Sequence, residues 1–440
     1  MKFGAWLGTL QCCCLFWSVA LARAPTMTYF VAYATVSENT LYIQGGIDVT
    51  NSSNSYNQFF SLDLTRSWNT SNPPWSEVIT AAGGRIPARL KTSFHSMSLS
   101  KDKKTLSIWD MYYSPPYGTS FHLDTNKWED LPTLPAQIPA GLKVLKAATD
   151  ATTDRVYIPG GAPDNGMLAY DPSSKVSSTI AMPPGGTVTS WNLYTFAWND
   201  VRRSFLYFGG YDTPGQSYFY EYAPAAAAPW TALTTSGSVP PLLSDSCMVS
   251  AYDGAKMVVF GGRSAGRLSG SVYILDVPTM TWSLGSSSQP RMAMVCSVSG
   301  DNLVVWGGVS WDDSATKVVL PATPAVYNMY TAQWTTTFIS KKDTPPRPVP
   351  TTPPPSIQSG ESGGRGTATG EVVGGTVTRP SGVDNSVTGA PKSNNAAIIG
   401  GAVGGGVVIV SIAVVVAVLV VRRRRNSRRR VSLPKEFWNI

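Results

Sequence analysis

"MVVFGGRSAGRLSGSVYILDVPTMTW", residues 257–282, contains two short apolar runs separated by a polar loop. The first run ends in Gly261 and Gly262, and the second ends in Asp276, shortly before Trp282. Runs of this length, bounded by turn-forming residues, are typical of β-strands. The stretch is therefore either one hairpin of an ordinary domain or one copy of a repeat, and a fixed period along the chain distinguishes the two.

An apolar run that ends in a glycine pair recurs along the chain. The other pairs are Gly45 and Gly46, Gly160 and Gly161, Gly209 and Gly210, and Gly307 and Gly308. The spacing is about fifty residues, which is a period typical of blade-forming repeats. The gap between the first two pairs leaves room for one more copy, and "TLSIWDMYYSPPYGTSFHLDTNKW" (105–128) fills it with Trp109 and Asp110 in place of the glycines. We therefore count six copies, one of them degenerate.

The second half of each copy repeats as well. An apolar run ending in an acidic or amide residue precedes a Trp in five copies: Asp63 before Trp75, Asp124 before Trp128, Glu221 before Trp230, Asp276 before Trp282, and Asn328 before Trp334. Copy three has Asp171 but no such Trp. Each copy is expected to form four short strands. Four-stranded units of this kind bury their faces by stacking radially against one another. The sequence thus predicts an all-β, six-bladed β-propeller, in which the glycines let neighbouring blades approach closely and each Trp buries a large area.

These repeats resemble the kelch-repeat β-propellers over roughly residues 27–339. A further kelch feature, Pro-x-Arg leading into His-Ser on the inner strand, is kept only in part, as Pro87, Arg89, His95 and Ser96 in one copy and as Pro290 and Arg291 in another. The departures in copies two and three affect the blade boundaries rather than the fold. A tandem of immunoglobulin-like sandwiches is the alternative, but it would lack the recurrent glycine pair and would call for paired cysteines.

The segments on either side of the propeller predict a single-pass (type I) membrane protein. Residues 1–22 combine one Lys, an apolar core and Ala-Leu-Ala, as in a cleaved secretory signal peptide. Residues 396–421 are apolar and uncharged, long enough for a transmembrane helix, and are followed by a basic cytoplasmic tail, residues 422–440. A lipid-anchor signal is the rival interpretation, but its apolar segment would end the chain. We expect the propeller, residues 23–339, to lie outside the cell or in the lumen of a secretory-pathway membrane.

The net charge of +8 is concentrated in the tail, which holds eight basic residues and one acidic residue. The rest of the chain is close to neutral, so nucleic acid is not an expected partner. The tail instead favours the anionic lipids of the inner leaflet. Residues 340–395, rich in Pro, Thr, Ser and Gly with few large apolar residues, predict an extended stalk.

The span, the tail and the first copy carry candidate modification and pairing sites. Asn51 and Asn69 begin glycosylation sequons, "NSS" and "NTS". In the span, Gly400 and Gly404, and likewise Gly401 and Gly405, lie four residues apart on one helix face, which permits a homodimer, although so many glycines also suit a lone span. Ser432 follows two arginines and is a candidate phosphorylation site, with a plain stop-transfer cluster as the simpler interpretation.

The chemistry available to the chain is limited. After signal cleavage two cysteines remain, Cys247 and Cys296, on the predicted inner strands of blades five and six. A disulfide suits an oxidising compartment, but inner strands of different blades are often too far apart, so the sequence favours buried thiols. His95 and His122, the two histidines, lie on different strands of one blade, and we expect His95 to be a packed, hydrogen-bonded residue. We therefore expect no metal, no cofactor and no catalytic constellation; a copper-radical-oxidase-like enzyme acting on extracellular carbohydrate or alcohols is the alternative, and it would need two His and two Tyr at one site.

A binding surface remains. The loops after the glycine pairs emerge on one face of a propeller, so their side chains converge. They contribute aromatic, Arg and acidic residues of the kind found in recognition patches: Tyr112, Tyr113, Tyr117, Tyr211, Asp212, Arg263, Arg267, Trp311, Asp312 and Asp313. The simpler interpretation is that the tyrosines cover their own loops. We predict a cell-surface receptor, adhesin or sensor that binds an extracellular protein or glycan.

Overall fold

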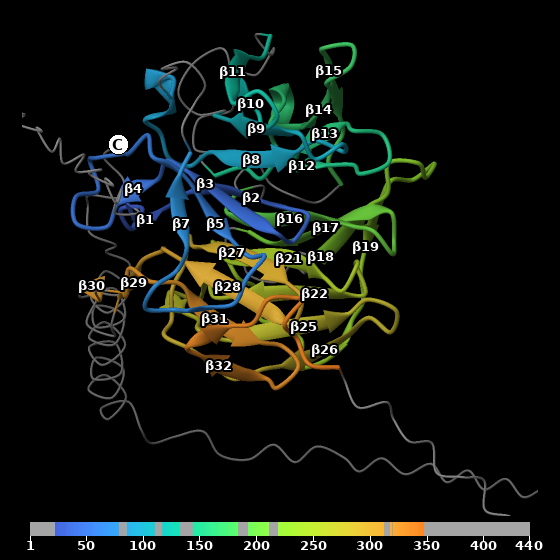
Figure 1. The fold of residues 1–440 in the computed structure, drawn as a ribbon. Helices are drawn as coiled ribbons and strands as arrows, with labels where there is room; N and C mark the ends of the chain where they lie inside the picture. The colour runs from blue at the N-terminus through green and yellow to red at the C-terminus, as the bar shows by residue number, and fades with distance from the viewer. Residues whose placement is uncertain are drawn as a thin grey trace, which may run out of the picture. The chain divides into compact units, whose positions relative to one another are not determined.

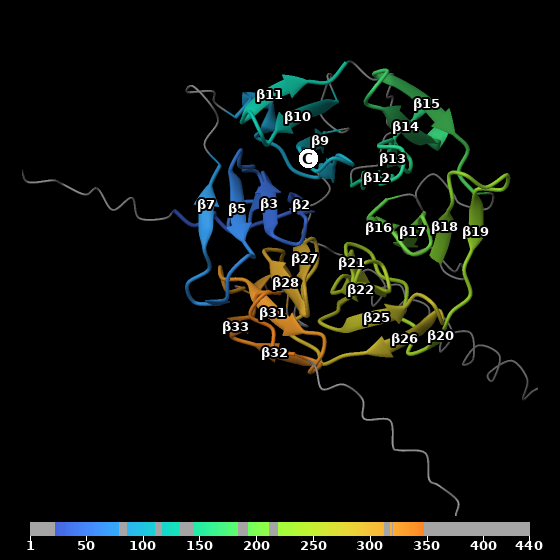
Figure 2. The ribbon, with the colours of Figure 1, turned by 45° about the vertical axis from the view of Figure 1, so that its right-hand side comes forward.

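Six blades of four antiparallel strands each surround a central channel, and the sheet of blade five has one further, parallel strand at its outer edge (Figures 1 and 2). The computed structural model describes residues 23–78, 86–110, 117–132, 144–183, 192–210, 219–311, 317–318 and 320–346. Within each blade the four strands follow chain order from the channel outwards, and the inner strands contact their neighbours around the whole ring. The predicted all-β, six-bladed propeller is therefore confirmed.

Each of the first three blades comes from one continuous piece of chain. Their strands, innermost first, are β2 (Ala32–Val36), β3 (Thr40–Gln44), β5 (Phe59–Asp63) and β7 (Trp75–Glu77) in blade one; β8 (Ser96–Leu99), β9 (Thr105–Trp109), β10 (Gly118–His122) and β11 (Lys127–Asp130) in blade two; and β12 (Ala148–Thr149), β13 (Val156–Ile158), β14 (Met167–Asp171) and β15 (Val176–Ile180) in blade three.

The last three blades repeat this arrangement. They are β16 (Tyr194–Asn199), β17 (Ser204–Gly209), β18 (Phe219–Tyr222) and β19 (Trp230–Ala232) in blade four; β21 (Cys247–Ala251), β22 (Lys256–Phe260), β25 (Val272–Asp276) and β26 (Thr281–Leu284) in blade five; and β27 (Val295–Ser299), β28 (Asn302–Trp306), β31 (Ala325–Asn328) and β32 (Gln333–Thr335) in blade six.

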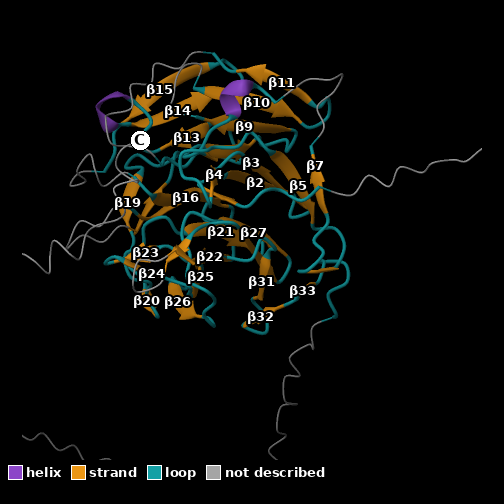
Figure 3. Ribbon diagram, turned by 90° about the vertical axis from the view of Figure 1, so that its left-hand side faces the viewer, coloured by secondary structure: helices purple, strands orange, loops and turns teal. Residues whose placement is uncertain are grey.

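Short strands and 3-10 turns lie in the loops between these strands (Figure 3). They are the pairs β1 (Thr28–Tyr29) with β4 (Ile47–Asp48), β6 (Trp68–Asn69) with β33 (Thr337–Phe338), β23 (Arg263–Ser264) with β24 (Arg267–Leu268), and β29 (Ser310–Trp311) with β30 (Lys317–Val318); the strand β20 (Ser236–Gly237), parallel to β26; and the 3-10 turns η2 (Ala88–Leu90) and η3 (Pro163–Asn165).

Four of the five glycine pairs hold neighbouring blades together, whereas in blade three the Gly161 amide donates to Ile158 of its own blade. In blade four Gly209 has φ +79°, and a methyl group there would overlap the carbonyl oxygen of Leu243, which leads into blade five. The amide of Gly210 donates to that same carbonyl at 3.1 Å. The amides of Gly46, Gly262 and Gly308 make the equivalent bonds to the next blade. The pair is thus required for close approach and for backbone hydrogen bonding, as the sequence predicted.

The acidic residue at the end of the third strand closes a turn. In blade five Asp276 Oδ1 accepts hydrogen bonds from the amide and hydroxyl of Thr279. In blade three Asp171 receives the same pair from Ser173, and these bonds lower the pKa of its carboxyl to about 2. This Asx turn reverses the chain into the fourth strand, which explains why the position repeats.

The hydrophobic core lies mainly between blades. One cluster joins Leu41 and Ile43 of blade one to Val304 and Trp306 of blade six. The ring closes there through the amide of Gly308, which donates to the Thr28 carbonyl, and through β33, which follows blade six and pairs with β6 of blade one. Trp68 of β6 stacks on Phe338 of β33 at 4.9 Å between ring centroids. The segment before β2 therefore accepts from blade six in the same way as the segments before β8, β21 and β27 accept from their preceding blades.

Blades five and six are joined covalently, which corrects the expectation of buried thiols. Cys247 opens β21 and Cys296 lies in β27, and the two form a disulfide across a Cα separation of 6.1 Å. The physical reason is that blades converge towards the channel, so adjacent inner strands approach within the range a disulfide spans.

Several predictions fall outside the described residues: the signal peptide 1–22, the stalk 340–395 beyond Pro346, the span 396–421 with Gly400, Gly401, Gly404 and Gly405, and the tail 422–440 with Ser432. Within the part of the chain that the structure describes, no helix has the length and apolar character needed to span a membrane.

Candidate functional site

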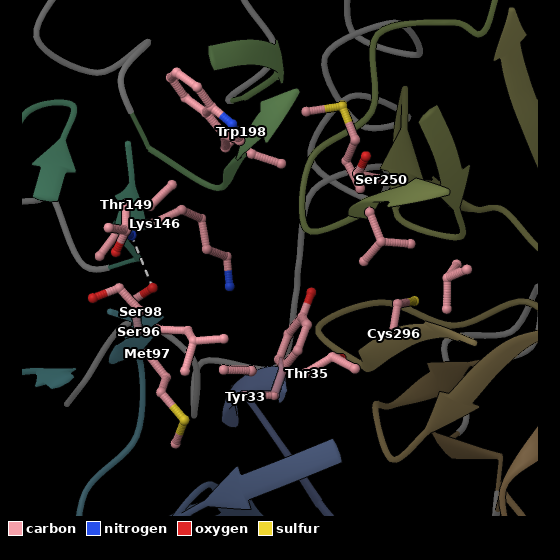
Figure 4. A pocket seen from close by; sticks show the side chains of 18 of the residues that line it. Tyr33, Thr35, Ser96, Met97, Ser98, Lys146, Thr149, Trp198, Ser250 and Cys296 are labelled. Atoms are coloured by element: carbon pink, nitrogen blue, oxygen red, sulfur yellow. Dashed lines mark hydrogen bonds between the residues drawn. The ribbon is translucent and has the colours of Figure 1, made fainter. Parts of the chain in front are cut away.

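The six inner strands surround a cavity of about 530 Å³ (Figure 4). Its wall mixes apolar residues with hydroxyl groups: Phe196, Val249 and Val298 lie beside Thr35, Ser98 and Ser250. Tyr33 and Lys146 lie near the beginning of their strands, and Figure 4 shows both side chains reaching into the cavity. Residues of all six blades therefore line this cavity.

One end of the channel is closed where the inner strands begin. Just before these strands, the chain adopts left-handed backbone conformations at Phe30, Phe94, Leu193, Asp245 and Ala293. Their amides donate to the corresponding carbonyls of the preceding blade: Phe30 to Ala293, Ala293 to Asp245, and Asp245 to Leu193. We call Phe30, Phe94, Val144, Leu193, Asp245 and Ala293 the closing ring; its apolar members pack in one cluster.

The loops that follow the second strands converge on this closed end. Ile47 of blade one and Leu268 of blade five belong to the same cluster as the closing ring, as do Val309 and Trp311 of blade six. We call this end of the propeller the loop face. Loops of blades one, five and six thus converge, whereas Ala162, in the described loop of blade three, belongs to a different cluster.

The described candidate residues differ in their exposure. Arg267 is exposed at the tip of the β23–β24 hairpin, whereas Arg263 is half-buried and its backbone pairs with Ser244. Trp311 packs in the apolar cluster of the loop face, and Tyr117 packs against the core around Trp109. The remaining candidates, Tyr112, Tyr113, Tyr211, Asp212, Asp312 and Asp313, lie outside the described residues. Of the described set, Arg267 is thus the residue best placed to contact a partner.

Burial perturbs three ionisable groups near the closed end. Desolvation raises the pKa of the Asp245 carboxyl to about 6, although Arg263 and Lys146 act in the opposite direction. It lowers the pKa of the Lys146 ammonium, against the attraction of Asp245. The His95 ring, bonded through Nε2 to Gln44 Oε1 at 2.6 Å, has its pKa lowered to about 3 by burial, so it is neutral at pH 7. The prediction of a packed, hydrogen-bonded His95 is confirmed.

The sequence reasoning missed Tyr33, Lys146 and Asp245. The available signal was the isolated charge in "LKVLKAATD" (142–150), where a lysine directly precedes an apolar inner strand. His122 lies apart from these residues, at the end of β10, where Nε2 contacts Glu129 Oε2 at 3.1 Å. The described residues bring together no group of three or more His, Cys, Asp or Glu side chains that could hold a metal ion.

Comparison with known proteins agrees with the repeat. The sequence model of the KLHDC2/KLHL20/DRC7 Kelch-repeats domain matches residues 196–352, which include blades four to six. This part of the ring is similar to a known kelch-repeat domain. The kelch match thus begins inside β16, the inner strand of blade four, and covers the blades with the most regular glycine pairs.

A curated protein shares a shorter segment with the chain. Acyl-CoA-binding domain-containing protein 6 of Oryza sativa subsp. japonica is 32% identical over 85 residues. The match covers 18% of this chain and 13% of the rice protein. A segment of this length corresponds to fewer than two blades at a spacing of about fifty residues, so the match does not indicate a shared overall activity.

Proposed function

We propose that this kelch propeller is a cell-surface binding protein whose loop face recognises an extracellular protein or glycan. Kelch propellers are scaffolds suited to protein binding. One observation supports the loop face as the binding surface. Loops from blades one, five and six pack into a single cluster there, and the exposed Arg267 projects from it. Rigidly supported loops with an arginine anchor have the composition expected of a recognition patch.

The extracellular placement rests on three features. The Cys247–Cys296 disulfide is stable in oxidising compartments and rare in the cytosol. Asn51 and Asn69 are exposed, and each side-chain oxygen accepts the amide of the Ser two residues on, at 3.1 and 2.9 Å. Both sequons thus present their Asn on an accessible Asx turn.

The proposed membrane attachment rests on the segments on either side of the propeller. Residues 1–22 direct the chain into the secretory pathway, and residues 396–421 anchor it with the tail 422–440 against anionic lipid. The stalk, residues 340–395, holds the propeller away from the bilayer.

The test is a binding screen with the purified full chain on arrays of glycans and extracellular proteins. Arg267→Ala is compared with Arg203→Ala, since Arg203 is equally exposed but lies in the β16–β17 turn at the opposite end of the blades. We expect Arg267→Ala to weaken a specific interaction at least about 10-fold, as for an anchor residue, and Arg203→Ala to leave it unchanged. Equal binding by the two variants, or no binding by the wild type, would contradict the assignment of the loop face.

A further inference from the structure

Lys146 occupies an unusual place for a lysine. It lies just before β12, next to the closing ring residue Val144, and lines the closed end of the central cavity. Figure 4 shows its side chain extending from the wall into the cavity, towards Tyr33. A long cationic side chain that points inwards in a propeller channel, rather than out to solvent, costs desolvation energy unless an anion accompanies it.

The described residues give Lys146 no close counter-ion. Among the described residues, none of the ion pairs within 4.0 Å involves Lys146. The acidic residue that acts on it electrostatically is Asp245, which belongs to the closing ring. Asp245 borders a separate small cavity shared with Lys146, and it is not among the residues that line the large one. The large cavity thus meets the ammonium group without a carboxylate of its own nearby.

The other charges of the cavity are gathered at its opposite end. Glu38, Lys103, Asp200, Asp253 and Lys341 line the cavity from the turns that follow the inner strands, or from the chain after β33. Glu38 and Lys341 pair with each other at 3.6 Å. A negative group that enters from that end passes these charges of both signs and then meets the ammonium group of Lys146 at the closed end.

Neutral hydrogen-bonding groups line the same cavity as Lys146. Ser96 Oγ accepts the Ala147 amide at 2.8 Å, which leaves its hydroxyl proton available. The Tyr33 hydroxyl points into the cavity, where it also interacts with the Cys296 backbone, and burial raises its pKa, so it stays protonated. An ammonium group in a partly apolar chamber of low effective dielectric that also presents hydroxyls is a pre-arranged site for a carboxylate or phosphate oxygen.

We propose that the central cavity binds a small organic anion, with its carboxylate or phosphate group paired to Lys146. The volume of about 530 Å³ falls within the range of small-molecule sites, and the apolar walls at Phe196 and Val249 accommodate the remainder of such a molecule. The site opens at the end away from the loop face, so it is separate from the surface proposed above and does not depend on it.

The test measures thermal unfolding of the purified full chain at low salt with citrate, glucuronate or inorganic phosphate. At least one probe is expected to raise the midpoint of the wild type in a saturable way, since binding to the folded state stabilises it. Lys146→Met removes the charge at similar length, Lys146→Arg keeps it, and Lys127→Met removes an exposed lysine of β11 as the matched control.

The apparent affinity is expected to fall at least about 10-fold in Lys146→Met, as for loss of a charge-assisted hydrogen bond, and to persist in Lys146→Arg and Lys127→Met. The midpoint without any probe reports whether Lys146→Met folds. The proposal is overturned if none of the three probes shifts the wild type, or if the shift survives unchanged in Lys146→Met.

Discussion

Blades four to six and the junction between blades two and three hold together by different means. Blades four, five and six each present a glycine pair whose second amide donates to the backbone of the next blade in the ring. In blade two, Trp109 and Asp110 occupy the positions of the glycine pair. The contacts that the structure describes at this junction are made by side chains. Trp109 donates through Nε1 to Ser98 Oγ and packs edge-on against Tyr170 of blade three.

The comparison shows that a repeat can keep its geometry after losing its motif. Ser96 Oγ accepts the Ala147 amide and so links blade two to blade three, whereas the four junctions with a glycine amide bond between blades use a backbone carbonyl. Backbone bonds do not depend on side-chain identity, except for the glycines that make room for them. The junction between blades two and three instead depends on a few large or polar side chains. Single substitutions should therefore destabilise the two regions in different ways.

Trp109→Ala gives the largest expected effect. The side chain is 1% exposed and lies in the cluster shared with blades three and four, so its removal leaves a cavity and an unpaired Ser98 hydroxyl. We expect a loss of about 4 kcal/mol in the free energy of unfolding, measured by chemical denaturation. Trp198→Ala, at a partly buried Trp on an inner strand, should cost clearly less. Equal losses of unfolding free energy in the two variants would show that the junction between blades two and three has no special dependence on Trp109.

Gly209→Ala tests the regular region. A methyl group at this position meets both a left-handed backbone and the Leu243 carbonyl, so we expect a loss of about 3 kcal/mol. Gly266→Ala is the matched control, because Gly266 has φ +80° but no atom within 4 Å of the added methyl. The control should lose about 1 kcal/mol from the backbone alone. A difference near zero between the two variants would contradict the role of the glycine pair in blade contact.

Asp245→Asn probes the charged member of the closing ring, at the junction of blades four and five. Its carboxyl pKa is raised from 3.8 to about 6, so the folded state holds this proton more tightly than the unfolded state does. The unfolding free energy of the wild type, relative to Asp245→Asn, should therefore fall by roughly 2 kcal/mol as the pH rises from 4 to 7. Chemical denaturation of both proteins across this pH range measures the difference between their unfolding free energies. The contributions of the other carboxyl groups cancel in this difference. A constant difference would contradict the raised pKa.

Sequence reasoning predicted the features that repeat. The glycine pairs, the turn-forming Asp276 and Asp171, and the Trp of the fourth strands recur at a fixed spacing, so they fixed six blades, their strand order and the convergence of the loops of blades one, five and six. It failed where a feature occurs once. The Cys247–Cys296 disulfide depends on how closely two inner strands approach at the channel, a distance that no local pattern encodes.

The cavity site was missed for a related reason. Lys146 comes from blade three, Tyr33 from blade one and Asp245 from the start of blade five, and only closure of the ring brings them near one another. The sequence thus predicts the blades better than the centre that they share.

The most direct test of the closed ring is residue-level hydrogen exchange of the full chain. The amides of Gly46, Gly210, Gly262 and Gly308 make equivalent bonds between blades, and the bond of Gly308 to Thr28 joins the last blade to the first. We expect all four amides to exchange at the slow rate of global unfolding, because the ring opens as one unit. Exchange at Gly308 about 100-fold faster than at the other three would show that the ring opens between blades six and one, and would contradict a single closed scaffold presenting one loop face.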